Sequence, residues 1–228
     1  MKKFLLCALG ALFLVAPLAT NAQPRSREYI RNAIREYGEC RNVAITQSNG
    51  DLMLYGQNGY AADGCPSDLL SAMKKLHDES EYINDIQLTE GGKWLILFGE
   101  NGIQWNDIPY SLESQLREFN SNYETITSVT FNDANQWVII TTKHISASEQ
   151  WIQDWLVDGT KAHGQLWAVC LTGDAMVAVY ESGYKFYGEV PSSLRSALKE
   201  TTLNVYRLKI AGTAWFFADK NGSYRYNM

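Results

Sequence analysis

Metal-binding spacings and catalytic signature motifs are missing from this chain of 228 residues. Its three histidines and four cysteines include no Cys-x-x-Cys pair and no neighbouring pair of histidines, so the spacing gives no metal signature. The chain also lacks G-x-S-x-G, H-E-x-x-H, P-loop and EF-hand patterns. The sequence therefore calls for no metal and no cofactor, and it offers no recognisable catalytic constellation.

Long apolar runs are missing as well, with one exception at the N-terminus. Met1-Lys2-Lys3 precedes an apolar run from Phe4 to Leu18, and Thr20-Asn21-Ala22 gives a small-x-small ending. The run is shorter than the roughly 20 residues of a membrane span, so the pattern predicts a secretory signal peptide over residues 1–22. An uncleaved anchor is the alternative. We expect a bacterial-type export to the periplasm or the cell exterior, and a mature chain of residues 23–228.

Clusters of Lys and Arg are absent from the expected mature chain. Without Lys2 and Lys3 it holds 18 basic and 25 acidic residues, a net charge of −7. Nucleic acids and anionic membrane surfaces select for basic clusters, so both are poor partners. The remaining partner classes are a glycan or a protein. The sequence leaves the oligomeric state open.

Few cysteines remain once Cys7 leaves with the signal peptide. An oxidising compartment permits a disulfide. Cys40 follows a predicted helix, and Cys65 follows the first sheet unit at the start of the next helix, so we predict a Cys40–Cys65 bond. Cys170 lies in an apolar stretch and reads as a small buried hydrophobe.

Self-similarity is the strongest signal in the sequence. Five mostly apolar segments each follow a turn element, and the intervals between these turns are 42, 43, 38 and 39 residues. Four segments end in an Asn-Gly or Ser-Gly turn, a strong hairpin signal because both central residues of such a turn need positive φ. A further apolar run precedes each first turn. The units, which we expect to be three-stranded antiparallel meanders within one domain, are 41–81, 82–124, 125–164, 165–203 and 204–228.

A helix is predicted after each of the first four meanders. Apolar residues recur three and seven positions after the helix start, which places them on one helix face. In the third copy we place Ser148 at the start, and Trp151 and Trp155 at the two apolar positions. A further helix, residues 26–38, precedes the first meander. The helices after the first, second and fourth meanders each begin with a proline, which suits a first helical turn. These prolines are Pro66, Pro109 and Pro191.

The order of these elements suggests how the units assemble. The chain begins with a helix and ends with strands, so the first helix could fill the vacancy after the last meander. A meander with one helix cannot bury its apolar face alone, whereas units arranged around an axis can, and closure protects the sheet edges. We predict a mainly β fold with helices, an α+β repeat forming a closed five-bladed β-propeller-like ring. An open curved repeat array, with the first helix as a cap, is the alternative.

The best-preserved copy of the repeat also carries a resemblance. Its pattern is Trp94-x-hydrophobic, then Asn101-Gly102, then Pro109-x-x-Leu112-x-x-x-Leu116. It resembles a tandem repeat of uncharacterised secreted bacterial proteins, over essentially all of residues 41–228. Its residues are turn, cap and core types, so the resemblance implies repeat architecture and no activity.

Two groups of residues are candidates for a ligand site. Aromatic residues at the start of the middle strands (Trp94, Trp137 and Trp215) are expected in the core. The aromatic residues of the third strands alternate between the two faces of the strand, so some of them must face away from the core. The third-strand candidates are Tyr60, Trp105, Tyr184, Tyr187, Tyr224 and Tyr226, and the alternative is that they wall the space between units. The divergent third unit adds Lys143, His144, Trp151, Asp154 and Trp155.

The leading hypothesis from these features is an exported, non-enzymatic binding module. Exposed Tyr and Trp beside Asn, Gln and Asp residues suit recognition of a glycan or a protein. The first alternative is a secreted hydrolase with carboxylates at the ring centre or in the third unit. The second is a structural component of a cell-surface assembly.

Overall fold

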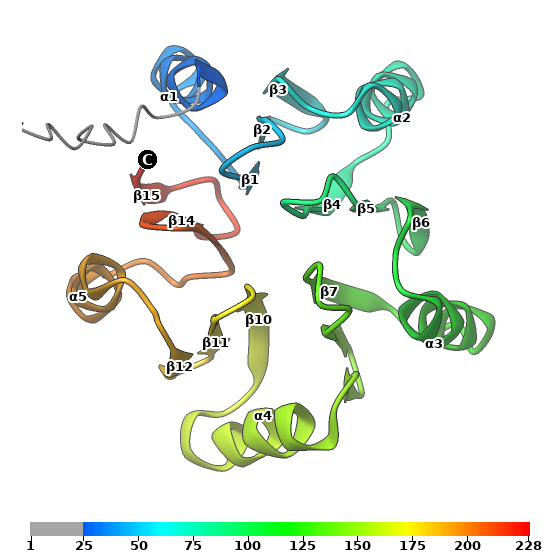
Figure 1. The fold of residues 1–228 in the computed structure, drawn as a ribbon, viewed down its shortest axis with the longest axis vertical. Coiled ribbons are helices and arrows are strands. Elements are labelled where there is room, and N and C mark those ends of the chain that lie inside the picture. The colour runs from blue at the N-terminus through cyan, green and yellow to red at the C-terminus, as the bar shows by residue number, and fades with distance from the viewer. Residues whose placement is uncertain (1–24) are drawn as a thin grey trace, which may run out of the picture.

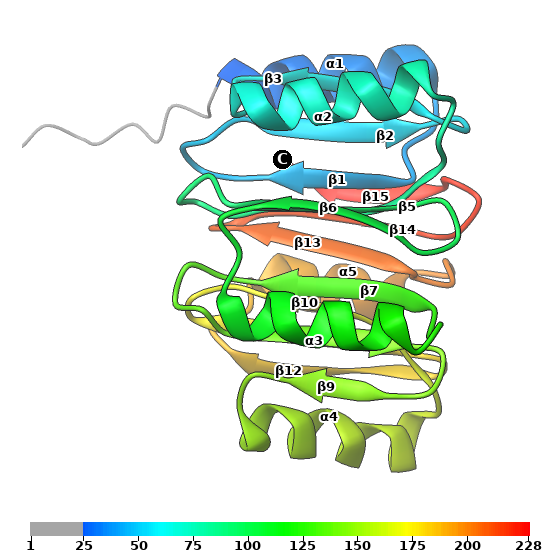
Figure 2. The same cartoon turned by 90° about the vertical axis from the view of Figure 1, so that its right-hand side faces the viewer.

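Five separate sheets are arranged around a common axis, with helices on the outside (Figure 1). The computed structural model describes residues 25–228, so the predicted signal peptide lies outside the described residues. Strands and helices run in the same general direction, along the axis down which Figure 1 looks (Figure 2). Within residues 25–228, no helix is long and apolar enough to cross a membrane.

Each sheet is a three-stranded antiparallel meander in chain order, as the repeat predicts. The strands are β1 (Asn42–Ile45), β2 (Asp51–Tyr55) and β3 (Gly59–Asp63); β4 (Ile83–Leu88), β5 (Trp94–Phe98) and β6 (Gly102–Asn106); β7 (Ile126–Phe131), β8 (Trp137–Thr141) and β9 (Ile145–Ala147); β10 (Leu166–Leu171), β11 (Ala175–Tyr180) and β12 (Gly183–Gly188); β13 (Arg207–Ala211), β14 (Ala214–Ala218) and β15 (Tyr224–Asn227). The helices are α1 (Arg25–Tyr37), α2 (Ser67–Asp78), α3 (Tyr110–Ser121), α4 (Gln150–His163) and α5 (Ser192–Glu200).

The Asn-Gly turns form where they are predicted. Gly222 of the last turn has the expected positive φ, but the first two turns depend on another feature. Positive φ occurs at Gly56 and Gly99, before the Asn-Gly pairs, and neither Asn58 nor Asn101 adopts it. Gly59 begins β3 instead, and a Cβ there would lie 2.6 Å from the Tyr55 ring. The glycine is therefore needed because an aromatic ring of the paired strand covers its backbone.

The helices fill the spaces between neighbouring sheets. Each of the five hydrophobic clusters combines one helix with the two sheets beside it. In one cluster Leu112 and Leu116 of α3 pack with Leu95 of β5 and Ile139 of β8. Every sheet is therefore covered on both faces, and one helix takes part in each cluster.

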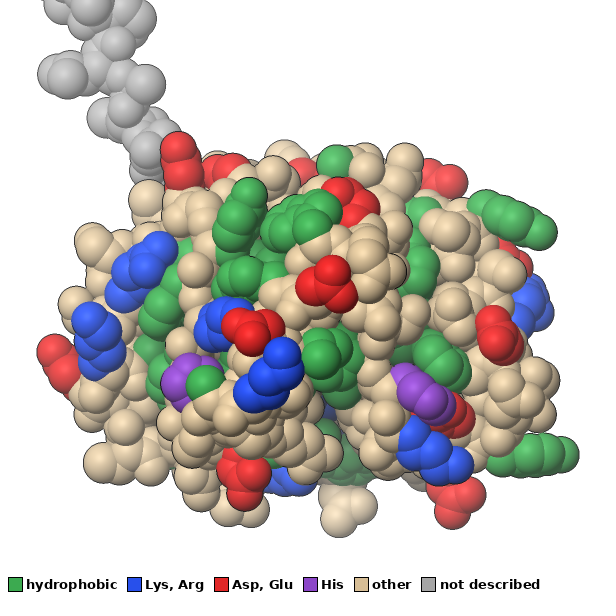
Figure 3. Space-filling model, turned by 90° about the horizontal axis from the view of Figure 1, so that it is seen from below, with side chains coloured by type: hydrophobic (Ala, Val, Ile, Leu, Met, Phe, Trp, Pro, Cys, Tyr) green, Lys and Arg blue, Asp and Glu red, His purple; other side chains and the backbone are tan. Residues whose placement is uncertain are grey.

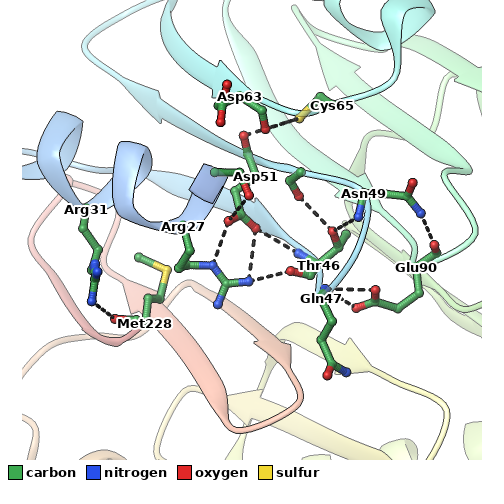
Figure 4. Close-up of polar contacts among 12 residues, drawn as sticks. Arg27, Arg31, Thr46, Gln47, Asn49, Asp51, Asp63, Cys65, Glu90 and Met228 are labelled. Atoms are coloured by element: carbon green, nitrogen blue, oxygen red, sulfur yellow. Dashed lines mark hydrogen bonds and ion pairs between the residues drawn. The ribbon is translucent and has the colours of Figure 1, made fainter. Parts of the chain in front are cut away.

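The first helix packs with both ends of the chain. Ile30 and Ile34 of α1 share one cluster with Met53 of β2 and with Phe216 and Met228 of the last unit. The first and last sheets therefore meet with α1 between them, although each sheet keeps its own three strands. Polar contacts reinforce the arrangement (Figure 4). The Arg27 guanidinium donates to the buried Asp51 carboxylate (Nε–Oδ2 2.8 Å), and Arg31 Nη1 donates to the Met228 carbonyl oxygen at 3.1 Å.

The tryptophans that begin three middle strands are core residues, as predicted. Trp94, Trp137 and Trp215 are each 5% exposed. Their indole Nε1 atoms donate to side chains in the first turn of the helix packed against them, at 2.9 to 3.0 Å. The acceptors, which occupy equivalent positions two residues after the helix proline, are Asp68, Ser111 and Ser193.

A buried polar network occupies the axis. Polar residues recur at intervals of 43 residues on the innermost strands, at Asn42, Asp85 and Ser128. The strand register shifts just before Asp85 and just before Ser128, and such an irregularity changes the direction in which a side chain points. Asp85 is 1% exposed and accepts from Asn42 Nδ2 (2.8 Å), Ser128 Oγ (3.2 Å) and Lys209 Nζ (3.2 Å). Arg207 Nε lies 3.8 Å from the same carboxylate. Burial alone would raise the pKa of Asp85, but the charges of Lys209 and Arg207 and the Asn42 hydrogen bond hold it below the usual range.

The expected Cys40–Cys65 disulfide is not formed, which corrects the prediction. Cys40 lies in the cluster around α1, and Cys65 lies in the next cluster around α2. Their thiols contact different backbone carbonyls, those of Asn42 and Asp51. Desolvation raises the pKa of Cys65 to about 12 and that of Cys40 still further. Both cysteines therefore act as small buried hydrophobes, and so does Cys170.

Candidate functional site: an exposed aromatic cluster on α4 and β12

Helix α4 buries a different face from the one its sequence suggests. It begins at Gln150, one residue later than the repeat alignment places it, with Glu149 at the proline position. Ile152 and Leu156 therefore take the two core positions. The prediction that Trp151 and Trp155 occupy these positions is wrong, and both indoles are displaced toward the helix side that faces β12.

The alternation of β12 supplies the partner side chains. Tyr184 and Phe186 pack against the cluster between the fourth and fifth sheets. Lys185 and Tyr187 point the other way, toward α4, which confirms that the aromatic residues of this strand are split between two faces.

Three aromatic rings meet on this surface, and we call Trp151, Trp155 and Tyr187 the aromatic cluster. The Tyr187 ring centroid lies 5.1 Å from that of Trp151 and 6.4 Å from that of Trp155. Trp151 is 41% exposed, Tyr187 is 50% exposed and Trp155 is half-buried. Figure 3 shows the α4 side, where hydrophobic side chains gather among acidic and basic ones.

Polar side chains surround the rings. Trp151 Nε1 donates to Glu149, which also accepts from Gln136 Nε2 at 2.7 Å. The hydrogen bond from Gln136 has the larger effect and that from Trp151 the smaller, and together they lower the pKa of Glu149 and keep its carboxylate ionised. Asp154 accepts from Gln150 and is exposed, so it is available to a ligand.

A lysine holds the other side of the cluster. Lys185 Nζ donates to the Trp155 carbonyl oxygen at 2.7 Å and lies 4.6 Å from the centre of the Trp155 ring. It also lies 3.5 Å from the Asp158 carboxylate. Sequence reasoning missed Lys185 and Glu149. The signal for Lys185 was its position two residues before Tyr187, on the same face of the strand.

Equivalent positions in the other units are not aromatic. In the fourth sheet Met176 pairs with Tyr187 of β12. The residues at the same position in the first, second and fifth sheets are Asp63, Asn106 and Asn227, which pair with Asp51, Trp94 and Trp215. The helix position of Trp151 carries Asp68, Ser111 or Ser193 elsewhere, and in the fourth sheet Met176 replaces the buried tryptophan. The fold is built without this cluster in other units, so it is a local addition.

The remaining third-strand candidates lie between sheets. Tyr60, Trp105, Tyr184, Tyr224 and Tyr226 are partly buried and pack against the hydrophobic clusters. Their placement matches the alternative stated above, in which they wall the space between units. Only Tyr187 of the predicted set belongs to the half-exposed surface.

Lys143 and His144 are separated from the aromatic cluster. They form the turn between β8 and β9, where His144 Nδ1 lies 2.7 Å from Glu124 and its ring stacks on Phe119. Of the third-unit candidates, the structure therefore brings together Trp151, Trp155 and Asp154, and it leaves this pair elsewhere. Among residues 25–228 no group of three or more His, Cys, Asp or Glu side chains could hold a metal ion.

Comparisons with known proteins add little to this geometry. No family model matches the chain, and no curated protein matches it. Among solved structures, the chain is similar to one described as YCF48 bound to D1 peptide, at 10% identity and a TM-score of 0.27. The similarity covers 80% of this chain and 49% of that one, so the chain spans about half the length of the structure it matches.

Proposed function

We propose that this protein is an exported binding module that recognises a glycan or a protein through the aromatic cluster on α4 and β12. The observation that carries the proposal is the half-exposure of Trp151 and Tyr187 next to polar side chains that are already oriented. Such rings offer apolar contact area without a large loss of side-chain entropy, and their neighbours offer hydrogen bonds.

The charges around the cluster narrow the ligand. Glu149, Asp154 and Asp158 are carboxylates, and Lys185 is held by Asp158 and by a backbone carbonyl. An anionic ligand would meet uncompensated repulsion here. Sugar hydroxyls can donate to carboxylates while the ring face stacks on an indole, and a protein partner would instead present a basic or aromatic surface.

The hydrolase alternative has less support. The carboxylate at the ring centre, Asp85, is buried and already bonded to Asn42, Ser128 and Lys209, so it cannot reach a substrate. His144 pairs with Glu124 away from the aromatic cluster. Of the carboxylates beside the cluster, Glu149 is held ionised by hydrogen bonds from Gln136 and Trp151, so it is a poor proton donor for hydrolysis.

We also propose that α1 closes the five units into a ring. It fills the position after the last sheet that α2 to α5 fill after the others, and its contacts with both chain ends support this role. A ring would give the protein five outer faces, of which only the one at α4 carries the aromatic cluster.

The test is a glycan array probed with the mature protein and three variants. Trp151→Ala and Tyr187→Ala should each reduce binding by about thirtyfold or more, the loss expected for an interface anchor. Tyr123→Ala is the matched control, because Tyr123 is 93% exposed and outside the cluster. Glycan binding that all three variants retain would refute the proposed site. Binding to no glycan would direct the same variants to a cross-linking screen for a protein partner.

A further inference from the structure

A concave site lies at the axis, apart from the aromatic cluster. A cavity of about 770 Å³ opens where the turns after the five innermost strands converge. Its volume is in the range of small-molecule sites, roughly 300–1,000 Å³. All five units contribute to its wall, and no residue of the aromatic cluster does.

The floor of this axial cavity carries hydrogen-bonding capacity that the protein leaves unused. Gln87 is 8% exposed, and its amide makes one long contact, from Nε2 to Asp85 Oδ1 at 3.5 Å. No donor within residues 25–228 reaches its carbonyl oxygen. Lys209, also 8% exposed, uses two of its three N–H groups, on Asp85 and on the Ile86 carbonyl oxygen. Thr130 Oγ accepts from Leu171 N, which leaves its own proton free.

Charge selects against ionic ligands at this site. Four carboxylates line the cavity: Glu90, Asp133, Asp174 and Glu189. They repel an anion at the rim, because the Arg27 cation of the lining is neutralised by Asp51. At the floor Lys209, with Arg207 on the far side of Asp85, opposes a cation. A ligand that fits both ends is uncharged and carries groups that donate as well as accept.

We propose that the axial cavity binds a small uncharged polyhydroxylated ligand, of the size of a mono- or disaccharide. Its hydroxyls donate to the Gln87 carbonyl oxygen and accept from Lys209 and Thr130 at the floor. At the rim they donate to Asp174 and Glu189, which lie next to each other, since Glu189 N donates to the Asp174 carbonyl oxygen at 3.1 Å. This site is independent of the aromatic cluster.

The experiment measures binding of methyl glycosides of glucose, galactose, mannose and N-acetylglucosamine by saturation-transfer NMR and calorimetry. Concentrations on the order of 10 mM detect dissociation constants of about 1 mM. The full mature chain should bind at least one of them. Thr213→Trp, which places a large side chain at the cavity mouth, should abolish binding. Gln87→Leu should weaken it about tenfold, as expected for one lost hydrogen bond.

Two controls separate this proposal from the aromatic cluster and from misfolding. Ser71→Trp adds the same bulk to an exposed helix position and should leave binding unchanged. Trp151→Ala should also leave it unchanged, so failure of one site is distinguishable from failure of the other. The proposal is overturned if none of the glycosides binds, or if Thr213→Trp binds as the parent does while its thermal unfolding shows a folded protein.

Discussion

Replacing Asp85 by asparagine removes one negative charge from the axis and almost no volume. Asp85 is the sole carboxylate within reach of Lys209 and Arg207 among residues 25–228, and these side chains are 10% and 5% exposed. Breaking a buried ion pair from one side costs about 3–5 kcal/mol, because the other charge stays buried without compensation. The new amide could still accept one hydrogen bond from Asn42 or Ser128. We therefore expect Asp85→Asn to reduce the free energy of unfolding by about 3–5 kcal/mol.

The assay is urea denaturation of residues 23–228 at pH 7, with thermal unfolding as a second measure. For a domain of this size each kcal/mol corresponds to about 2–4 °C, so the midpoint should fall by about 6–20 °C. Asp78→Asn is the matched control. It breaks the exposed Lys74–Asp78 pair, whose side chains are 70% and 56% exposed, and it should change stability by less than about 0.5 kcal/mol.

The pH dependence gives an independent check. The pKa of Asp85 is lower in the folded state than its ordinary value, so its contribution is present above about pH 4 and is lost as the pH falls through the folded value. The parent protein should lose this contribution to its free energy of unfolding in acid, and the Asp85→Asn variant, which lacks the carboxylate, should not. Desolvation lowers the pKa of Lys209. In the Asp85→Asn variant, raising the pH toward the ordinary pKa of lysine should let Lys209 deprotonate. The difference in free energy of unfolding between the variant and the parent should then become smaller. A loss below about 1 kcal/mol with an unchanged denaturant slope would refute the reasoning.

Three further predictions concern a second buried ion pair, the packing of α4 and the state of the thiols. Arg27→Met leaves the fully buried Asp51 without its cation, so urea unfolding should show a loss of about 3–5 kcal/mol. Gly159→Ala should destabilise by about 1–3 kcal/mol, since the new Cβ would lie 2.1 Å from Tyr180 Oη, and Tyr180→Phe in the same chain should restore part of the loss in calorimetry. Alkylation of residues 23–228 in denaturant should add three labels by mass spectrometry. The native protein should resist labelling, because burial raises the pKa of Cys65 to about 12. A disulfide would instead be established by an unlabelled mass two daltons below that of the fully reduced chain, together with only one label added in denaturant.

The repeat architecture is accessible from sequence because its signals are local. Turn residues and apolar periodicity recur at nearly constant intervals, and each specifies a meander or a helix without reference to distant segments. The helix after the third meander was misplaced by one residue because it lacks the proline that marks the other starts. Ile152, beside Trp151, was an equally apolar choice. That single shift decides whether the tryptophans of α4 are core or surface.

The axial groups could not be predicted in the same way. Lys209 and Asp85 are 124 residues apart, and their contact depends on the arrangement of the units around the axis. The interval of 43 residues between Asn42, Asp85 and Ser128 was visible, but these residues differ in type and read as ordinary polar positions of a strand. The Asn-Gly turns were located correctly, yet the neighbouring aromatic ring that requires Gly59 becomes evident only once the strands are paired.

The packing of α1 against both chain ends has a consequence for the order of folding. Four of the five cores are made from neighbouring units and can form as the chain lengthens. The core around α1 needs Phe216 and Met228, so it forms only once the fifth sheet is present, with the loop-closure entropy of the 197 residues between Arg31 and Met228 set against it. Until then α1 exposes its apolar face. A protein of this design completes its fold in one late step, when α1 joins the last sheet to the first.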